Sequence, residues 1–372
     1  VCGKTARTVL RGVYLQLFKR LKKEVNLLMR LLESKKYRDD LKKAISNTDL
    51  SELNNKSIFI TGGLGLICST IVDVLLVGCN ATIYVGARSE QRFGERFGGI
   101  DAVKYVHYDA LSDFDFSFNP DYIIHGAGLA SPDLYTSMPV ETLLSNLNGV
   151  QVLLKYLKGR NSGRLLYVSS SEVYGKKRTE KPFVEGIYGE VDIDSIRSSY
   201  VIAKRAAEMM CKAYSSEYNV ETIIVRPGHI YGPSAKRDDR RISSDFAFKA
   251  AHGEKLEMKS SGLQKRSYCY SVDCAIQILT ALMKGEKGQV YNVGHDDVIT
   301  IKKMAEIYAD ASSVTLTATE PTEDELKAFN PMKNSALDNS KLKNLGYKDT
   351  FSVNEGLRHT VEILKEIAGD GD

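Results

Sequence analysis

The feature that most constrains the fold is an alternation of short apolar runs with helical stretches, which begins at residue 57. Stretches with helical spacing, such as 140–158 and 198–218, lie between the strand-like runs. Apolar strands that alternate with helices predict a parallel sheet covered on both faces. After Pro227 the alternation becomes irregular, which suits a smaller second domain. The strand-like runs are SIFIT (57–61), ATIYVGA (81–87), VKYVHY (103–108), DYIIHGA (121–127), RLLYVSS (164–170) and VETIIVRP (220–227).

The first 43 residues differ in charge from the rest. They carry 13 Lys or Arg against 4 Asp or Glu, whereas the remaining chain carries 38 against 43. Residues 6–45 contain no proline and predict an amphipathic helix, packed on the body or on a second subunit. Contact with an anionic membrane surface is the alternative. Nucleic acid is disfavoured because no aromatic interleaving accompanies the charge. The apolar positions are Leu10, Tyr14, Leu17, Leu21, Val25, Leu28 and Leu32.

Composition excludes several classes of protein. With 43% apolar and 26% charged residues, the chain of 372 residues has the make-up of a globular protein. No apolar run approaches the roughly 18 residues that a membrane span needs, and Lys or Arg interrupt every candidate signal-peptide core. The six cysteines form no C-x-x-C pair, so we expect reduced thiols, no metal site, no disulfide framework and a cytoplasmic location.

Glycines directly follow the first predicted strand. In FITGGLGLICSTIVDVLL, they lead from the strand into a helix. Such glycines let the backbone turn tightly and approach a pyrophosphate, whose charge the helix N-terminus stabilises. Cys68 stands where a third glycine of this pattern is expected. We predict a dinucleotide site that includes Gly62, Gly65, Leu66 and Ile67.

The next two strand ends bear on which dinucleotide binds. An acid after the second strand would hold the adenosine ribose of NAD, but YVGARSEQR offers Arg88. An arginine there can pair with the 2′-phosphate of NADP or stack on adenine, so NAD and NADP both stay open. Asp109, after the third strand, is a candidate contact for the adenine amino group, with a solvated turn residue as the alternative.

A tyrosine and a lysine lie four residues apart in SSYVIAKRAAEMM, which places Tyr200 and Lys204 on one helix face. An ammonium near a phenol stabilises the phenolate. We therefore expect Lys204 to lower the pKa of Tyr200 toward neutrality and to make the phenol a usable base. Ser170 ends a predicted strand upstream. Together with the glycine loop, this set outweighs a chance surface pair.

These motifs together resemble the extended short-chain dehydrogenase/reductases that act on nucleotide sugars. The resemblance runs from residue 57 to about 360 and rests on TGGLGLI, HGAG, VSSSEVYG, Tyr200-x-x-x-Lys204, RPGHIYGP, KRSYCYSVDC, YNVG and LDNSKLKNLGY. It implies a doubly wound, Rossmann-like α/β sheet over residues 56–227, to which some later segments return. It also implies a nucleotide-sugar domain mainly over 228–372, after a basic helical extension and linker over 1–55.

The resemblance implies chemistry as well. NAD(P) oxidises the sugar, usually at C4, with Ser170, Tyr200 and Lys204 as the general catalytic set. The substrate is UDP- or dTDP-linked, and the protein is a homodimer formed through two helices of the sheet domain. A polysaccharide or glycoconjugate precursor pathway is the natural setting. Further implied cofactor contacts are Arg88, Asp109, Ala127, Gly128 and Pro227, together with Tyr200 and Lys204.

The residue after the strand-end serines indicates which reaction follows the oxidation. A 4-epimerase usually has a small or uncharged residue at the position of Glu172, and a 4,6-dehydratase carries Asp-Glu after a threonine. VSSSEVYG instead resembles the UDP-glucuronate decarboxylases, which carry Ser-Glu before Val-Tyr-Gly. Oxidation of a glucuronate at C4 gives a β-keto acid that loses CO₂. Glu172 and Ser171 are then expected to manage the proton at C5, and Arg266, in LQKRSYCY, to supply a cation.

Alternatives remain for these assignments. Glu172 as an inert loop acid and Arg266 as a diphosphate contact are the simpler interpretations. The alternative reactions are those of an NDP-sugar 4-epimerase or a dTDP-glucose-type 4,6-dehydratase. A non-catalytic scaffold that works through the basic helix is a third class, which the intact Ser170, Tyr200 and Lys204 set disfavours. The implied substrate contacts are Glu172, Arg197, His229, Arg241 and Arg266.

The sequence also departs from the family pattern. His229 stands where RPGHIYGP usually has an asparagine that holds the sugar or diphosphate. Gly126 replaces a larger residue in HGAG, and Lys333 lies where an arginine often contacts uridine. With Cys68 and the missing ribose acid, these departures indicate a divergent branch.

Overall fold

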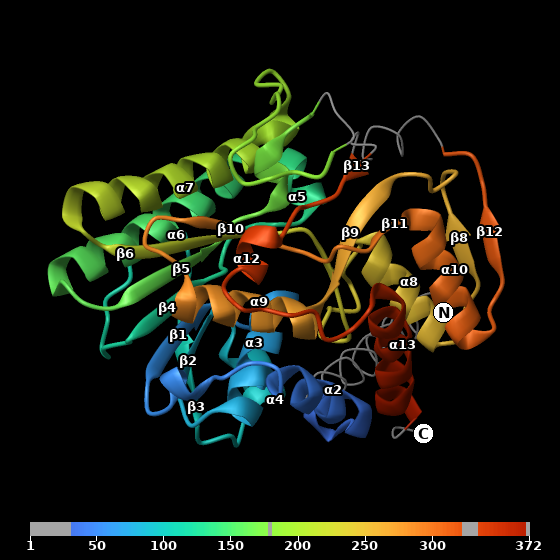
Figure 1. Ribbon diagram of the computed structural model, residues 1–372, viewed down its shortest axis with the longest axis horizontal. Helices are drawn as coiled ribbons and strands as arrows, with labels where there is room; N and C mark the ends of the chain where they lie inside the picture. The colour runs from blue at the N-terminus through green and yellow to red at the C-terminus, as the bar shows by residue number, and fades with distance from the viewer. Residues whose placement is uncertain (1–30, 178–180, 322–333, 370–372) are drawn as a thin grey trace, which may run out of the picture.

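A seven-stranded parallel sheet forms the centre of the larger domain (Figure 1). The computed structural model describes residues 31–177, 181–321 and 334–369. The strands are β1 (Ser57–Thr61), β2 (Thr82–Ala87), β3 (Val103–His107), β4 (Tyr122–His125), β5 (Arg164–Val168), β6 (Glu221–Pro227) and β10 (Val290–Val293). Their order is β10-β6-β5-β4-β1-β2-β3, so the direction of winding reverses between β1 and β4. All six predicted strands are present, and β10 returns to the sheet from the later part of the chain.

Helices cover both faces of this sheet. On one face α3 (Leu66–Gly78) packs against α9 (Ser271–Lys284), and on the other α6 (Pro139–Arg160) packs against α7 (Ser199–Tyr218). Strand β1 shows why both faces are apolar, because successive side chains of a strand point in opposite directions. Ile58 and Ile60 join the core cluster that contains α3 and α9, while Phe59 joins the cluster that contains α6 and α7. The predicted doubly wound fold is confirmed.

A smaller domain lies at the right of Figure 1. Its central strand is β9 (Lys265–Tyr270), which pairs with β7 (His229–Tyr231), β11 (Val298–Thr300) and β13 (Asn334–Ser335). A second pair joins β8 (Leu256–Met258) to β12 (Leu316–Ala318). Three helices pack together around these strands: α8 (Ile242–Ala251), α10 (Ile301–Ser312) and α13 (Val353–Gly369). These strands and helices come mostly from residues after Pro227, while β10 from the same part of the chain belongs to the large sheet.

The start of the described chain differs from the prediction of one long helix over residues 6–45. A short 3₁₀ turn, η1 (Leu31–Glu33), ends before α2 (Lys35–Ile45), because Ser34 leaves the helical conformation and its side chain caps Tyr37 N at 3.1 Å. Helix α2 packs on α3, α9 and α13 (Figure 1). The apolar positions predicted from Leu10 to Leu28 lie outside the described residues.

Residues 46–56, predicted to be a polar linker, are packed against the body. They contain a 3₁₀ turn, η2 (Ser51–Leu53), and the side chains of Leu50 and Leu53 are buried. A Cβ on Gly78 would lie 2.7 Å from Leu50, so the end of α3 leaves room for this segment. In the part of the chain that the structure describes, no helix is long and apolar enough to span a bilayer.

Candidate active site

The carboxyl ends of four neighbouring strands bring the predicted residues to one edge of the sheet. Gly62 follows β1, Ala127 and Gly128 follow β4, Ser170 lies just beyond β5, and Pro227 ends β6. In an open α/β sheet, ligands bind outside these strand ends, beside the point where the winding reverses. Residues predicted from separate motifs therefore share one region.

The turn after β1 depends on glycine. Gly62 has φ of +68°, and a Cβ there would lie 2.8 Å from the carbonyl carbon of Gly126. Gly65 is the N-cap of α3 and supplies no side-chain hydrogen bond to the helix. The first N–H groups of α3 thus have no side-chain cap and face a turn that a backbone or ligand can approach closely.

Two departures from the family pattern meet in space. A Cβ on Gly126 would clash with Sγ of Cys68, which lies in the first turn of α3. Cys68 is buried, and burial raises the pKa of its thiol to about 12. The larger side chain at Cys68 and the missing one at Gly126 therefore compensate each other, with the helix still packed against the strand.

Tyr200 and Lys204 of the predicted catalytic set lie on α7, and Ser170 is the N-cap of η3, just after β5. Tyr200 and Lys204 are buried, and Lys204 Nζ donates to the carbonyl of Val168 at 2.9 Å. Burial raises the pKa of Tyr200 to about 12, and a hydrogen bond with Ser170 offsets part of that rise. The net pKa of Tyr200 is therefore not lowered toward neutrality, and that expectation is wrong: Lys204 Nζ lies 5.7 Å from the centre of the Tyr200 ring, and burial lowers the pKa of Lys204 itself to about 8.

Sequence reasoning missed Tyr135, in the short helix α5 (Pro132–Ser137). Its ring stacks on Tyr200 with centroids 4.3 Å apart and planes 8° apart. Its hydroxyl donates to the carbonyl of Ala130 at 3.0 Å, and the Arg197 guanidinium lies 5.8 Å from its ring centre. The proline that opens α5 signals a helix, but no sequence pattern signals this stacking.

Glu208 was also missed, although it lies one turn after Lys204 on α7. Its buried carboxylate accepts from Ser169 Oγ at 2.6 Å and from Arg226 Nε at 2.9 Å. It also raises the pKa of Lys204 and so opposes the larger effect of burial. The i, i+4 spacing of Lys204 and Glu208 was the available signal.

Glu172 is held in place by an arginine. It lies in η3 (Ser171–Tyr174), where its backbone N–H donates to Ser170 Oγ at 3.2 Å. Arg197, in η4 (Ile196–Ser198), donates to both carboxylate oxygens, at 3.2 and 3.4 Å. The Arg197 and Glu172 side chains are 25% and 20% exposed, so the pair is fixed and still reachable. An inert, fully solvated loop acid would not have this support.

His229, Arg241 and Arg266 lie close enough together to interact electrostatically. Burial lowers the pKa of His229 to about 3, and the positive charges of Arg266 and Arg241 lower it further. Burial also lowers the pKa of Arg266, an effect that Tyr268 and Glu172 oppose. Arg241 is the N-cap of α8, and its Nε donates to Asp239 at 2.9 Å. Its predicted substrate contact would have to form beside this ion pair.

The outlying predicted residues are less closely tied to the site. Arg88 is exposed just after β2, and burial together with the charges of Arg92 and Arg88 lowers the pKa of Lys236. Asp109 accepts from Leu111 N at 3.0 Å, which matches the turn-residue alternative. Lys333 and Cys2 lie outside the described residues. The five described cysteines are free, and within the same described ranges no cluster of side chains could hold a metal ion.

Comparison with known proteins identifies the family. A family model described as the NAD dependent epimerase/dehydratase family matches residues 58–294, more than half of the chain. The chain belongs to this family. UDP-glucuronic acid decarboxylase 6 of Arabidopsis thaliana is 31% identical over 313 residues, which cover 82% of this chain and 87% of that protein. UDP-glucuronic acid decarboxylase 1 of Xenopus tropicalis is 30% identical over 321 residues, which cover 85% and 74%.

Solved structures of NAD-dependent sugar enzymes share the fold. The UDP-N-acetylglucosamine 4-epimerase of Methanobrevibacter ruminantium superposes with a TM-score of 0.72 at 23% identity, over 83% of this chain and 98% of that chain. The UDP-glucuronic acid 4-epimerase of Bacillus cereus, solved with UDP-glucuronic acid and NAD, gives 0.69 at 20% identity, over 83% and 99%. These likenesses confirm the extended short-chain dehydrogenase/reductase architecture.

The residues of this chain fit the dinucleotide that gives the family its name. Two observations carry the fit: the close approach of the Gly62 and Gly126 backbones, and the helix N-terminus at Gly65 without a side-chain cap. A pyrophosphate needs this combination of open backbone and unpaired N–H groups. The Cys68 side chain fills the space beside Gly126 and lies on the protein side of the turn.

Proposed function

We propose that the protein decarboxylates UDP-glucuronate to UDP-xylose, through a 4-keto sugar and with NAD as the cofactor. The observation that carries the proposal is the Glu172 carboxylate, which Arg197 fixes beside Tyr200 in a partly exposed site. Its negative charge acts to raise the pKa of both Tyr200 and Arg266. The curated relatives at about 30% identity are UDP-glucuronic acid decarboxylases, which supports the same reaction.

NAD would be held by Gly62, Gly65 and the N-terminus of α3, and when bound it takes up and returns a hydride. Tyr200 accepts the proton of the C4 hydroxyl, which Ser170 orients through its position between the phenol and Glu172 N. Since burial holds the pKa of Tyr200 at about 12, the phenol needs additional positive charge nearby to act as a base. Lys204 and the cationic nicotinamide of the oxidised cofactor are the groups suited to supply that charge.

The second half of the reaction breaks the bond between C5 and the carboxyl carbon. The ketone at C4 accepts the electron pair that CO₂ leaves behind, so the β-keto acid becomes an enolate. Arg266 provides a cation for the developing charge. Glu172, which is partly exposed, takes a proton from solvent and passes it to C5 with the help of Ser171. Arg197 keeps the Glu172 carboxylate oriented while this proton moves.

The alternatives are 4-epimerisation and 4,6-dehydration, which solved neighbours of this fold carry out. Both would proceed through a 4-keto sugar and would leave C6 attached to the sugar. The partly exposed acid at Glu172 favours decarboxylation over epimerisation, because an epimerase needs only the ketone and a rotation of the sugar.

Product analysis tests the proposal directly. The purified protein is incubated with NAD and one nucleotide sugar at a time, and the product masses are measured by mass spectrometry. The sugars are UDP-glucuronate, UDP-glucose, UDP-N-acetylglucosamine and dTDP-glucose. We expect UDP-glucuronate to lose the mass of one CO₂. Loss of one water from an NDP-hexose, or an unchanged mass with altered chromatographic mobility, would instead identify a dehydratase or an epimerase.

We also propose that two copies associate through α6 and α7, as the resemblance implies. Val140 and Leu144 on α6 and Met209 on α7 are 58%, 43% and 64% exposed, which gives these helices an apolar outer surface. Light scattering of the purified protein tests this, and a monomeric mass would contradict it. The cytoplasmic location stays a prediction.

A further inference from the structure

Helix α2 precedes residue 58, where the family match begins, yet it contacts both domains. It lies against α3 and α9 of the larger domain and against α13 of the smaller one (Figure 1). The buried side chains on its inner faces are Tyr37, Asp40, Leu41 and Ala44. A helix in this position can fix how the two domains meet.

The N-terminal end of α2 forms hydrogen bonds with both domains. Ser34 Oγ donates to Glu366 of α13 at 2.6 Å, and Lys35 N donates to the same carboxylate at 2.8 Å. One turn further on, the Tyr37 hydroxyl donates to Asp73 of α3 at 2.8 Å. Asp73 is buried and forms an ion pair with Arg96, so the Tyr37 contact reaches the helix that starts at the glycine turn.

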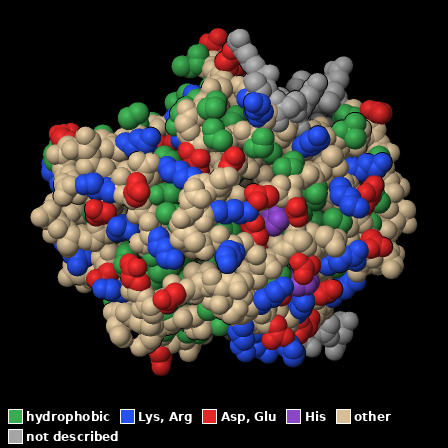
Figure 2. Space-filling model, viewed as in Figure 1, with side chains coloured by type: hydrophobic (Ala, Val, Ile, Leu, Met, Phe, Trp, Pro, Cys, Tyr) green, Lys and Arg blue, Asp and Glu red, His purple; other side chains and the backbone are tan. Residues whose placement is uncertain are grey.

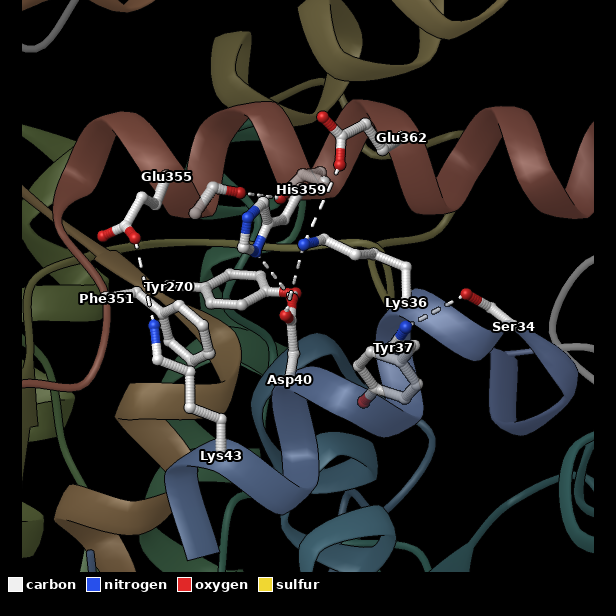
Figure 3. Close-up of polar contacts among 12 residues, drawn as sticks. Ser34, Lys36, Tyr37, Asp40, Lys43, Tyr270, Phe351, Glu355, His359 and Glu362 are labelled. Atoms are coloured by element: carbon white, nitrogen blue, oxygen red, sulfur yellow. Dashed lines mark hydrogen bonds and ion pairs between the residues drawn. The ribbon is translucent and has the colours of Figure 1, made fainter. Parts of the chain in front are cut away.

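Asp40 is the centre of the contact with the smaller domain (Figure 3). The Tyr270 hydroxyl donates to Asp40 Oδ2 at 3.0 Å, and His359 Nδ1 lies 3.0 Å from the same oxygen. Tyr270 comes from β9 and His359 from α13. The Asp40 side chain is 4% exposed, and a buried carboxylate with two such partners restrains both elements at once.

Strand β9 connects this contact to the candidate active site. Arg266, Tyr268 and Tyr270 alternate along it and therefore point to the same face. The partner strand β7 pairs His229 with Tyr268 and Tyr231 with Tyr270. Aromatic contacts continue along this face. The ring centroids of His229 and Tyr268 lie 5.8 Å apart, and those of Tyr231 and Tyr270 also lie 5.8 Å apart. One end of β9 thus carries the proposed catalytic arginine, and the other end is held by Asp40.

We propose that Asp40 is a positioning residue for the active site: through Tyr270 and β9 it sets the location of Arg266 and His229 relative to the cofactor domain. Helix α2 is then a bridge within the catalytic unit. The inference deepens the proposed function, since it concerns the same site, but it holds for whichever nucleotide sugar reacts there.

The outer rim of the bridge supplies a matched control. Asp39 of α2 is next to Asp40 in sequence and forms an ion pair with Lys35 of the same helix, and the two side chains are 51% and 78% exposed. Figure 2 shows basic and acidic side chains close together over this part of the surface. Exposed pairs of this kind contribute little. Asp39→Ala therefore removes a carboxylate from the same helix without touching β9.

The test compares Asp40→Ala, Tyr270→Phe, Asp40→Asn and Asp39→Ala in the full chain. Turnover is measured well below each melting temperature, together with the dissociation constant of NAD and amide hydrogen exchange of residues 265–270. We expect Asp40→Ala and Tyr270→Phe to lower kcat by about 10-fold or more, because small displacements of catalytic groups are costly. Exchange in β9 rises, whereas the affinity for NAD stays within about 2-fold, since the cofactor turn is not touched.

The conservative and control variants sharpen the result. Asp40→Asn keeps an acceptor for Tyr270, and we expect its kcat within about 3-fold of the wild type. Asp39→Ala should match the wild type in kcat, in the affinity for NAD and in the exchange of β9. If Asp40→Ala does not fold, Tyr270→Phe decides, because it removes one hydroxyl and keeps the ring.

If folded Tyr270→Phe has the kcat and the β9 hydrogen exchange of the wild type, the proposal is overturned. Helix α2 would then stabilise the contact between the domains without positioning the active site. A lower melting temperature with unchanged kcat would overturn it as well. Failure of the proposed function is seen separately, because the wild type would then release no CO₂ from UDP-glucuronate. The variants would in that case be compared on the sugar that does react, and without any turnover the exchange of β9 decides.

Discussion

The cofactor side and the sugar side of the candidate site differ in the kind of residue that forms them. On the cofactor side, Gly62, Gly126 and Cys68 fit together by shape, with two backbones in close approach and one thiol filling the space that a larger side chain leaves. On the sugar side, Glu172 and Arg197 are charged, come from separate short helices, and remain partly exposed. Tyr200 lies where the two sides meet.

This difference predicts different consequences of substitution. A change of volume should matter on the cofactor side, where atoms are close-packed and a Cβ has no room. Removal of a charge at constant volume should matter on the sugar side, where a carboxylate and guanidinium groups would act on the substrate. Variants that separate volume from charge therefore test the contrast.

The largest effect is expected at the junction. Tyr200→Phe removes the proposed base and keeps the ring that stacks on Tyr135, so we expect turnover to fall by about 10²–10⁴-fold. Steady-state kinetics with the reacting sugar measure this. Tyr218→Phe, at the exposed C-terminal end of the same helix, is the control, whereas the Tyr135 hydroxyl is unsuitable because it lowers the pKa of Tyr200. Retention of a tenth or more of the activity by Tyr200→Phe would mean that another group takes the proton.

On the sugar side, Glu172→Gln keeps the volume and removes the charge. We expect steady-state turnover to fall by about 10²-fold while sugar oxidation continues, so that reduced cofactor accumulates during a single turnover. Stability should change by less than about 1 kcal/mol, because the pair with Arg197 is partly exposed. Full turnover by Glu172→Gln would remove the acid from the mechanism. Asp133→Asn, which loses an exposed pair with Arg240, is the control.

Much of this contrast could be predicted from the sequence, but unevenly. The strands and the glycine turn follow from local pattern, because a parallel strand buried on both faces is apolar throughout and a tight turn requires glycine. Cys68 and Gly126 were each recognised as a departure. That they compensate each other could not be predicted, since they are 58 positions apart and only the packing of α3 against β4 brings them together.

Long-range contacts account for the rest. The stacking of Tyr135 on Tyr200 and the contact of Asp40 with Tyr270 join residues with no shared motif. The wrong expectation for the pKa of Tyr200 has a related cause. Helical spacing places Lys204 on the same face, but burial and the Val168 carbonyl, which depend on the tertiary structure, decide where its ammonium lies.

On the cofactor side, Gly126→Leu tests shape. The new side chain would meet Cys68 Sγ and the carbonyl of Thr61, so we expect a loss of about 1–3 kcal/mol in the free energy of unfolding and weaker binding of NAD. Denaturant unfolding and a cofactor titration measure the two effects. The double variant Cys68→Gly with Gly126→Leu restores the usual family pattern and should recover most of the loss. Additive losses in the double variant would contradict the proposed compensation.

The smallest expected effect concerns acid stability, to which both sides contribute. Burial lowers the pKa of His125, on the cofactor side, and of His229, on the sugar side, from the ordinary value of 6.5 to about 3. Between these values the unfolded chain binds more protons than the folded one, so stability falls as the pH drops from 6.5 toward 3. His229→Asn, which places the usual family residue there, removes one of the two contributions.

We therefore expect the free energy of unfolding of His229→Asn to fall less steeply with acidification than that of the wild type, with the residual slope including the His125 contribution. Denaturant unfolding at several pH values between 7 and 4 measures both slopes. At pH 7 both histidines are neutral in the folded protein, so the difference there reports packing alone and serves as the baseline. Identical slopes would mean that His229 is as well solvated as in the unfolded chain. The burial of its neutral ring would then contribute nothing to the pH dependence of stability.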